Sequence, residues 1–185
     1  MIYLKLIIGI TGSTGVIYGI RLLEILKKLE IETYLIMTKW ALKCVLLETN
    51  YDAKYVQSLS RIFNNNNLAA SISSGTHKVN GMIVAPCTMK TMASIANGYD
   101  DTLISRAATV TMKESRKLIL MPRESPLTAI HLENMLKLSR LGVVIIPPMM
   151  EFYTKPKSIS DIIDHGIGKC LDQFNIEHNL YDKWN

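Results

Sequence analysis

The chain has 185 residues, of which 48% are hydrophobic and 20% charged, and its formal net charge is +5. This length suits one domain spanning residues 1–185, with a core that buries most of its apolar surface. Lysine and arginine are spread along the chain without a basic block, which argues against a nucleic-acid surface and for a small anionic ligand. No apolar run is long enough to span a membrane, so we attribute the mean hydropathy of +0.15 to an interface between subunits and expect no membrane contact.

The cysteines and histidines give no sign of a metal site. Cys44, Cys87 and Cys170 are odd in number and widely spaced, a pattern typical of a reducing compartment. The histidines show no ligand spacing, so we assign no metal; they are His77, His131, His165 and His178. Met1 leads directly into the first strand and leaves no room for a signal or transit peptide, so we expect a cytoplasmic protein.

The segment from Lys5 to Gly15, KLIIGITGSTG, predicts a strand, a turn rich in Gly, Ser and Thr, and the start of a helix that runs to about Leu29. Such a turn lets the backbone approach an anion closely, and the helix behind it offers unpaired N–H groups and a partial positive charge. The glycines follow G-x-x-G-x-x-G, which differs from the dinucleotide and P-loop patterns. The second strand, 32–37, ends in Thr38 and Lys39 rather than in an acidic residue, which favours a phosphate or flavin over an NAD ribose.

The middle of the chain alternates between helices and one clear strand. A helix is expected over 40–48, whereas 50–76 gives a weak pattern in which 64–67, NNNN, resembles an exposed turn. A buried strand over 81–86 stops at Pro86, and a helix follows from Thr88 to Ala96. We expect Asp100 and Asp101 to cap the next helix, which turns Leu103, Ala107 and Ala108 inward.

The last third continues the alternation. A strand over 117–121 stops at Pro122, a helix follows with Leu132, Met135 and Leu136 on one face, and a strand over 142–146 ends before two prolines. Ser158 and Asp161 in capping-box spacing open the final helix. The residues expected to be buried on it are Ile159, Ile162, Ile163, Ile167 and Leu171.

Continuous apolar strands that alternate with helices indicate an α/β fold: a doubly wound, Rossmann-like or flavodoxin-like parallel sheet with helices on both faces. The ligand of such a sheet lies beyond the carboxyl ends of its strands. Here those ends carry hydroxyls, cations and one carboxylate, which favours a phosphate-bearing ligand. They are Thr11 to Thr14, Thr38 and Lys39, Cys87 to Thr91, Pro122 to Ser125, and the segment after Pro148.

From Ile8 to Trp184 the chain resembles the flavin prenyltransferases of the UbiX/Pad type, through GITGSTGVIYGIRLLE, PCTMKT, PRESPL and FYTKP. The resemblance implies an enzyme that joins a dimethylallyl group from dimethylallyl phosphate, or sometimes the diphosphate, to N5 and C6 of reduced FMN without a metal. It also implies that the product, prenylated FMN, serves a UbiD-type decarboxylase, and that the chains assemble as a homododecamer with sites at subunit boundaries.

The resemblance further implies residue roles by position. The FMN contacts would be Gly12, Ser13, Thr14, Thr38, Thr88, Met89, Lys90, Thr91 and Arg123. The prenyl phosphate would be bound by Tyr153 and Lys169, helped by Arg106 and Lys113 from neighbouring chains. The catalytic set would be Thr14, Glu48, Lys113, Glu124 and Trp184, with the carboxylates and Thr14 handling protons and Trp184 closing over the site. Thr14 and Thr38 stand where the family usually has Ser, and Lys169 where it often has Arg, which leaves the donor preference open.

Several of these residues also have plain structural interpretations. Lys113 and Lys169 suit solvated helix faces, Tyr153 suits packing, and Cys87 is better explained as a buried filler than as a nucleophile because no histidine partner is evident. Two other functions are weighed against prenyl transfer. One is an FMN-dependent decarboxylase of the cysteine-decarboxylase group, which uses a histidine after its second strand where this chain has Lys39 and Trp40. The other is a non-catalytic FMN carrier for a partner decarboxylase.

Overall fold

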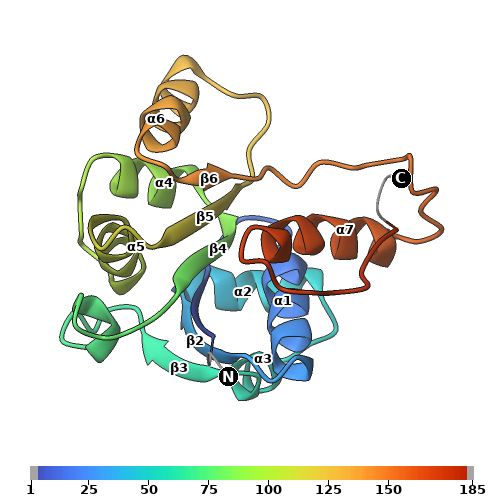
Figure 1. Ribbon diagram of the computed structural model, residues 1–185, viewed down its shortest axis with the longest axis horizontal. Helices are drawn as coiled ribbons and strands as arrows, with labels where there is room; N and C mark the ends of the chain where they lie inside the picture. Colours follow the sequence, from blue (N-terminus) through green and yellow to red (C-terminus); the bar gives the residue numbers. More distant parts are fainter. Residues whose placement is uncertain (1–3, 183–185) are drawn as a thin grey trace.

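The computed structural model describes residues 4–182, which form a parallel sheet in the order β3-β2-β1-β4-β5-β6 with helices on both faces (Figure 1). The predicted fold class is therefore confirmed. The strands are β1 (Lys5–Ile10), β2 (Glu32–Met37), β3 (Arg61–Asn64), β4 (Gly81–Cys87), β5 (Lys117–Pro122) and β6 (Val144–Ile145). The helices are α1 (Val16–Lys28), α2 (Lys39–Glu48), α3 (Ala53–Ser58), α4 (Met89–Ala96), α5 (Leu103–Lys113), α6 (Ala129–Arg140) and α7 (Ile159–Asp172), with a 3₁₀ turn at Ser71–Ser73.

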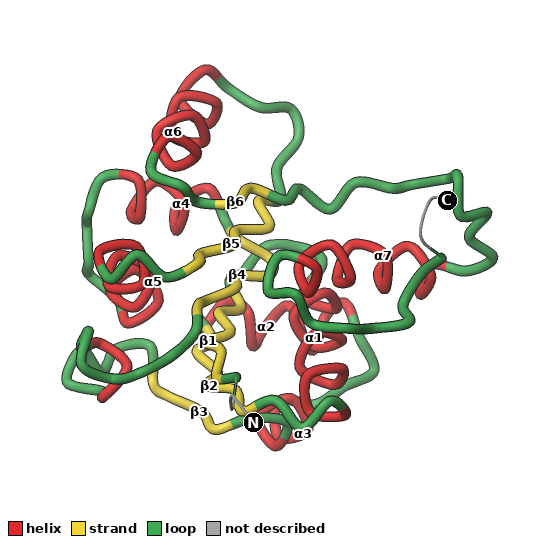
Figure 2. Tube along the Cα trace, in the orientation of Figure 1, coloured by secondary structure: helices red, strands yellow, loops and turns green. Residues whose placement is uncertain are grey.

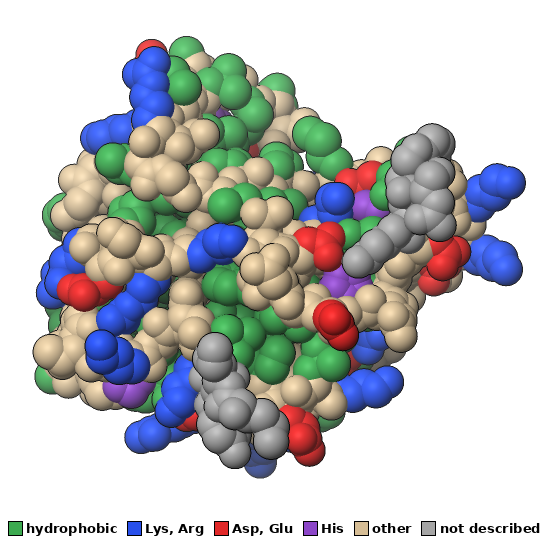
Figure 3. All heavy atoms as spheres, viewed as in Figure 1, with side chains coloured by type: hydrophobic (Ala, Val, Ile, Leu, Met, Phe, Trp, Pro, Cys, Tyr) green, Lys and Arg blue, Asp and Glu red, His purple; other side chains and the backbone are tan. Residues whose placement is uncertain are grey.

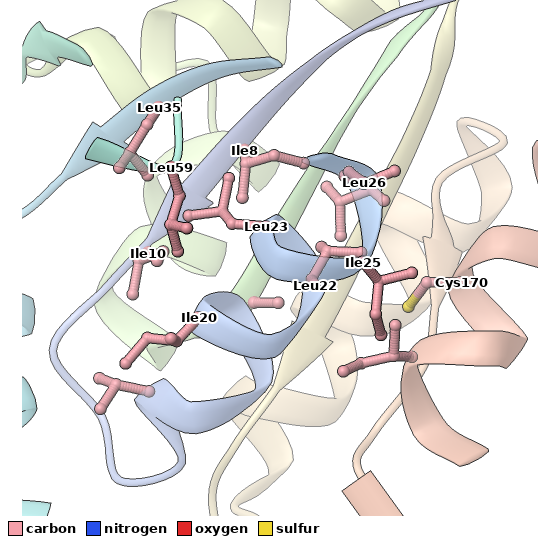
Figure 4. Packing of buried hydrophobic residues seen from close by; sticks show 14 of the residues in the cluster. Ile8, Ile10, Ile20, Leu22, Leu23, Ile25, Leu26, Leu35, Leu59 and Cys170 are labelled. Atoms are coloured by element: carbon pink, nitrogen blue, oxygen red, sulfur yellow. The ribbon is translucent and has the colours of Figure 1, made fainter. Parts of the chain in front are cut away.

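The sheet separates two buried apolar layers, because successive side chains of a strand point to opposite faces. In β1, Ile8 and Ile10 belong to one layer and Ile7 to the other. The first layer is completed by α1, α2, α3 and α7, and the second by α4, α5 and α6. Figure 2 shows α1 and α7 on one side of the strands and α4 and α5 on the other. In Figure 4, Ile20 and Leu23 of α1 lie beside Ile8 and Ile10 of the sheet.

The order of the strands positions the site. β1 pairs with β2 on one side and with β4 on the other, so the winding of the sheet changes direction between β1 and β4. In open parallel sheets this switch point is where ligands bind, at the carboxyl ends of the strands. α7 lies on α1, where the Nε and Nη2 atoms of Arg21 donate to the two carboxylate oxygens of Asp164 at 2.8 and 3.0 Å.

Residues 50–76, where the sequence pattern is weak, contain a short helix, α3, and a strand, β3, that the pattern did not reveal. β3 is an edge strand whose side chains are mostly exposed, so it lacks the apolar run that marked the central strands. The cap of α5 was also predicted wrongly. The capping hydroxyl belongs to Thr102, while Asp100 accepts the hydroxyl hydrogen bond of Thr109 at 2.8 Å.

Two helical faces expected to be buried are exposed in the single chain. Leu132 and Leu136 of α6 are each 52% exposed, although Leu138 is buried. Ile159, in the first turn of α7, is 76% exposed because this turn extends beyond the sheet, and Ile162 is half-buried. The remaining predicted core residues of α7, Ile163, Ile167 and Leu171, are buried as expected. Between residues 4 and 182, none of the helices combines the length and the hydropathy that a membrane span requires.

Candidate functional site

Four strand ends are tied together at the carboxyl edge of the sheet. The fully buried Thr11 hydroxyl donates to the carbonyl oxygen of Pro86 at 2.8 Å and accepts from the N–H of Thr88, also at 2.8 Å. The N–H of Thr38 donates to the carbonyl of Ile10 at 3.1 Å, and the N–H of Arg123 donates to the carbonyl of Cys87 at 3.2 Å. These bonds hold the loops that follow β1, β2, β4 and β5 in one fixed arrangement. We call this group of loops the rim.

Three helices begin at the rim. The N-cap of α1 is Gly15, whose φ of 93° favours glycine. α2 and α4 are capped by threonine hydroxyls, since Thr38 accepts from the N–H of Ala41 and Thr88 from the N–H of Thr91. The Thr88 hydroxyl also donates to that of Thr91 at 3.0 Å, so it is engaged inside α4. The N–H groups of these helix starts that no side chain engages make the rim suitable for an anion.

The loop from Thr11 to Gly15 has the features of a phosphate cradle. A Cβ atom on Gly12 would lie 2.2 Å from Cβ of Trp40, so glycine is required for this close approach. The Ser13 side-chain oxygen is buried and has no hydrogen-bond partner among the described residues. Leaving a buried hydroxyl unpaired is costly, and an oxygen of a bound phosphate would supply the missing partner. The residues present therefore fit a phosphate group at this loop.

Glu48 reaches the same loop from the end of α2. Its Oε2 atom accepts the N–H of Gly15 at 2.8 Å, which places a carboxylate at the N-terminus of α1. Glu48 thus lies at the glycine-rich loop, where its observed contact is a helix cap, and its catalytic role stays a prediction. The 33-residue separation between the partners explains why no local pattern pointed to this contact.

Tyr153 lies in a second group of side chains beside the rim. Its hydroxyl is 3.0 Å from Nε2 of His165 in α7. The ring of Tyr18 lies between the two groups, because a Cβ on Gly15 would be 3.5 Å from this ring and a Cβ on Gly166 would be 3.2 Å from it. Burial raises the pKa of the Tyr18 hydroxyl, and the charge of Glu151 adds to the shift.

Lys169 follows His165 by one helical turn and is exposed. Its ammonium lies 5.8 Å from the ring centroid of Tyr181. Lys169 and Tyr153 are therefore both neighbours of the His165 turn of α7.

Arg106 and Lys113 lie elsewhere in the chain, on α5. Nε of Arg106 donates to the carbonyl of Ser73 at 3.2 Å, and Lys113 pairs with its neighbour Glu114. Both side chains line a hollow of about 740 Å³. Because Lys113 ends α5 shortly before β5 begins, it lies toward the amino-terminal edge of the sheet, opposite the rim. One chain does not bring Lys113 to the rim, and the contribution of both cations to a neighbouring chain's site stays a prediction.

The remaining predicted residues are spread along the rim. Thr14 and Arg123 are exposed, and Glu124 is exposed with Oε1 accepting from the N–H of Ser125 at 3.2 Å. Met89 lies half-buried at the start of α4, while the Lys90 ammonium pairs with Asp101 at 3.0 Å. Trp184 lies outside the described residues.

Sequence reasoning placed Thr11 at a strand end without revealing the bonds it makes, and it gave no role to Tyr18 or His165, which also organise this region. Their partners are distant in the sequence; for example, 75 residues separate Thr11 from Pro86. His165 lies about two turns into the apolar helix α7, and no sequence motif marked it as a functional residue. Within residues 4–182, no group of three His, Cys, Asp or Glu side chains is arranged to hold a metal ion.

Comparison with known proteins identifies the family. The family model described as Flavoprotein matches residues 3–181. The chain is 50% identical over 183 residues to a probable UbiX-like flavin prenyltransferase of Escherichia coli O157:H7, covering 98% of this chain and 93% of that protein.

Two solved structures are closely similar. The first is a dodecameric FMN-dependent UbiX-like decarboxylase from Escherichia coli O157:H7, with a TM-score of 0.96, 49% identity, and coverage of 98% of this chain and 100% of that one. The second is AnUbiX (PadA1) in complex with FMN and dimethylallyl pyrophosphate, with a TM-score of 0.97, 45% identity, and coverage of 98% and 97%. Similarity of this extent, together with the rim and its phosphate cradle, leads to one conclusion: the chain belongs to the Flavoprotein family and, within it, to the UbiX-like flavin prenyltransferases.

Proposed function

We propose that this protein transfers a dimethylallyl group from dimethylallyl phosphate to N5 and C6 of reduced FMN, giving prenylated FMN for a UbiD-type decarboxylase. The observation that carries the proposal is the unpaired, buried hydroxyl of Ser13 in a loop where helices begin and glycine is required. Support comes from the relatives named flavin prenyltransferases and from the similar structure that contains FMN and dimethylallyl pyrophosphate.

The rim would hold FMN by its phosphate and its ring. Gly12 and Ser13 would contact the phosphate, whereas Thr14, Thr38 and Arg123 would contact the rest of the flavin. The first turn of α4 would cover the ring with Thr88, Met89, Lys90 and Thr91. Reduced FMN supplies the electron-rich ring atoms to which the C5 group becomes attached.

The chain's own cations would stabilise the leaving phosphate. Breaking the allylic C–O bond leaves an anion, and fixed donors aimed at that anion lower the barrier because they need no reorganisation during the reaction. Tyr153 and Lys169 would supply a hydroxyl and an ammonium from one protomer. Arg106 and Lys113 would reach the same phosphate from neighbouring protomers.

Ring closure on the flavin requires removal of a proton. Glu124, exposed at the rim after β5, would accept this proton directly or through the hydroxyl of Thr14. Glu48 would act from the N-terminus of α1, where it already accepts the N–H of Gly15. Trp184 would provide an aromatic face for the developing allylic cation.

A homo-oligomer, with a dodecamer as the expected form, would complete the site. Large apolar side chains are exposed on α6, where Figure 3 shows hydrophobic side chains at the top of the molecule. They include Leu132, Leu136 and Ile130, the last 68% exposed, and burial against other protomers would remove them from water. A cytoplasmic location stays a prediction from the cysteine content.

Turnover tests the proposal. The purified protein is incubated without oxygen with reduced FMN and dimethylallyl phosphate, and the flavin is analysed by mass spectrometry for the added C5 group. We expect the heavier flavin with wild type, and much less with Glu124→Gln. An FMN carrier would retain flavin without any gain in mass, and a cysteine decarboxylase would instead release carbon dioxide from a peptide with a C-terminal cysteine. Either result would overturn the proposed reaction.

A further inference from the structure

Tyr153, His165 and Glu151 form a continuous row of polar groups. The Tyr153 hydroxyl lies 3.0 Å from Nε2 of His165, and Oε2 of Glu151 lies 3.0 Å from Nδ1 on the other side of the imidazole. The Glu151 contact has the distance of an ion pair but not the alignment of a hydrogen bond. The imidazole is therefore hydrogen-bonded to Tyr153 on one side and lies in close contact with the Glu151 carboxylate on the other.

The imidazole of His165 is held rigidly. The residue is 1% exposed, and its ring packs against Tyr181 with a centroid distance of 4.2 Å. The Tyr181 hydroxyl in turn donates to Asp172 at the end of α7. The Tyr153 ring also meets the imidazole edge-on, with a centroid distance of 5.7 Å. By contrast, Tyr153 is 43% exposed and comes from the long segment between β6 and α7.

We propose that His165 is a positioning residue that fixes the Tyr153 hydroxyl for the phosphate of the prenyl donor. This inference rests on the proposed function. A phenol has one proton to donate, and when Nε2–H of His165 donates to the phenol oxygen, that proton can go to a phosphate oxygen; because Nδ1 faces Oε2 of Glu151 at 3.0 Å, this arrangement requires a hydrogen on both imidazole nitrogens. A fixed donor also loses less conformational entropy when the ligand binds than a tyrosine on an untethered segment.

A matched pair of substitutions isolates this role. In His165→Gln the side-chain amide reaches the position of Nε2, whereas in His165→Asn it reaches only that of Nδ1, next to Glu151. Both variants remain polar. Binding of dimethylallyl phosphate to the FMN-loaded protein is measured by titration calorimetry, and FMN retention by its absorbance.

His165→Asn is expected to raise the Kd for dimethylallyl phosphate roughly tenfold, the loss of one good hydrogen bond, while the FMN affinity stays unchanged. His165→Gln is expected to stay within about threefold of wild type. Combining His165→Asn with Tyr153→Phe should weaken binding no further than Tyr153→Phe alone, because both remove the same contact.

Three results would overturn the inference: equal donor affinity in the Asn and Gln variants, an undiminished effect of His165→Asn in the Tyr153→Phe background, or full donor affinity in Tyr153→Phe itself. The last measurement needs no change at the buried histidine, so it remains decisive if His165→Asn fails to retain FMN. Failure of the proposed function looks different, because wild type itself would then neither bind dimethylallyl phosphate nor add mass to FMN.

Discussion

Replacing Thr11 by valine is expected to lower the free energy of unfolding by about 2–3 kcal/mol. Valine has nearly the shape of threonine, so the change removes two hydrogen bonds without creating a cavity. The carbonyl of Pro86 still accepts the N–H of Thr11 at 3.2 Å after the substitution. Losing the bond from the Thr11 hydroxyl to this carbonyl therefore costs about 1 kcal/mol, as for an ordinary hydrogen bond. The N–H of Thr88 loses the hydroxyl oxygen that accepts it, which adds about 1–2 kcal/mol for a partly buried donor.

Urea unfolding at a fixed protomer concentration measures the effect, because the stability of an oligomer depends on that concentration. The control is Thr11→Ser, which keeps both hydrogen bonds and loses one buried methyl group, at a cost of about 1 kcal/mol. We also expect Thr11→Val to weaken FMN binding, since Thr88 at the start of α4 is no longer tied to the loop after β1. If valine were tolerated as well as serine, the hydrogen bonds of Thr11 would not be what holds the rim together.

Gly12→Ala should abolish FMN retention, seen as loss of flavin absorbance after gel filtration, because the new Cβ would lie 2.2 Å from Cβ of Trp40 and the loop must move; retention at the wild-type level would contradict this. Burial raises the pKa of Cys87 and of Cys170 to about 12 from an ordinary 9.0. The unfolded chain then ionises first, so each thiol should lower the free energy of unfolding by about 1.4 kcal/mol per pH unit from pH 9 to 12, with its full contribution present below pH 9. A urea midpoint that did not decrease between pH 9 and pH 12 would exclude this contribution of the buried thiols. Leu132→Lys, on the exposed face of α6, should give smaller assemblies in light scattering, and an unchanged assembly size would remove this face from the interface.

The residues at the rim could be foreseen from the sequence because parallel strands all end at the same edge of a sheet. Once apolar runs mark the strands, the residues that follow them must be neighbours, as the bonds of Thr38 to β1 and of Arg123 to β4 show. The failures have equally physical causes. β3 carries too little buried surface to show a pattern, and Leu132 and Ile159 were assigned to a core because a helical stripe does not reveal what it packs against.

By itself, the sequence determined the alternation of strands and helices, the glycine-rich first loop and the motifs of the family, all of which are local or repeat at short intervals. Only the tertiary structure decided which distant groups meet. It brings Glu48 to the start of α1, places His165 against Tyr153, and sets Lys113 on the far edge of the sheet. The reason is that hydropathy and turn preference act over a few residues, whereas the contacts of a polar side chain depend on how whole elements pack.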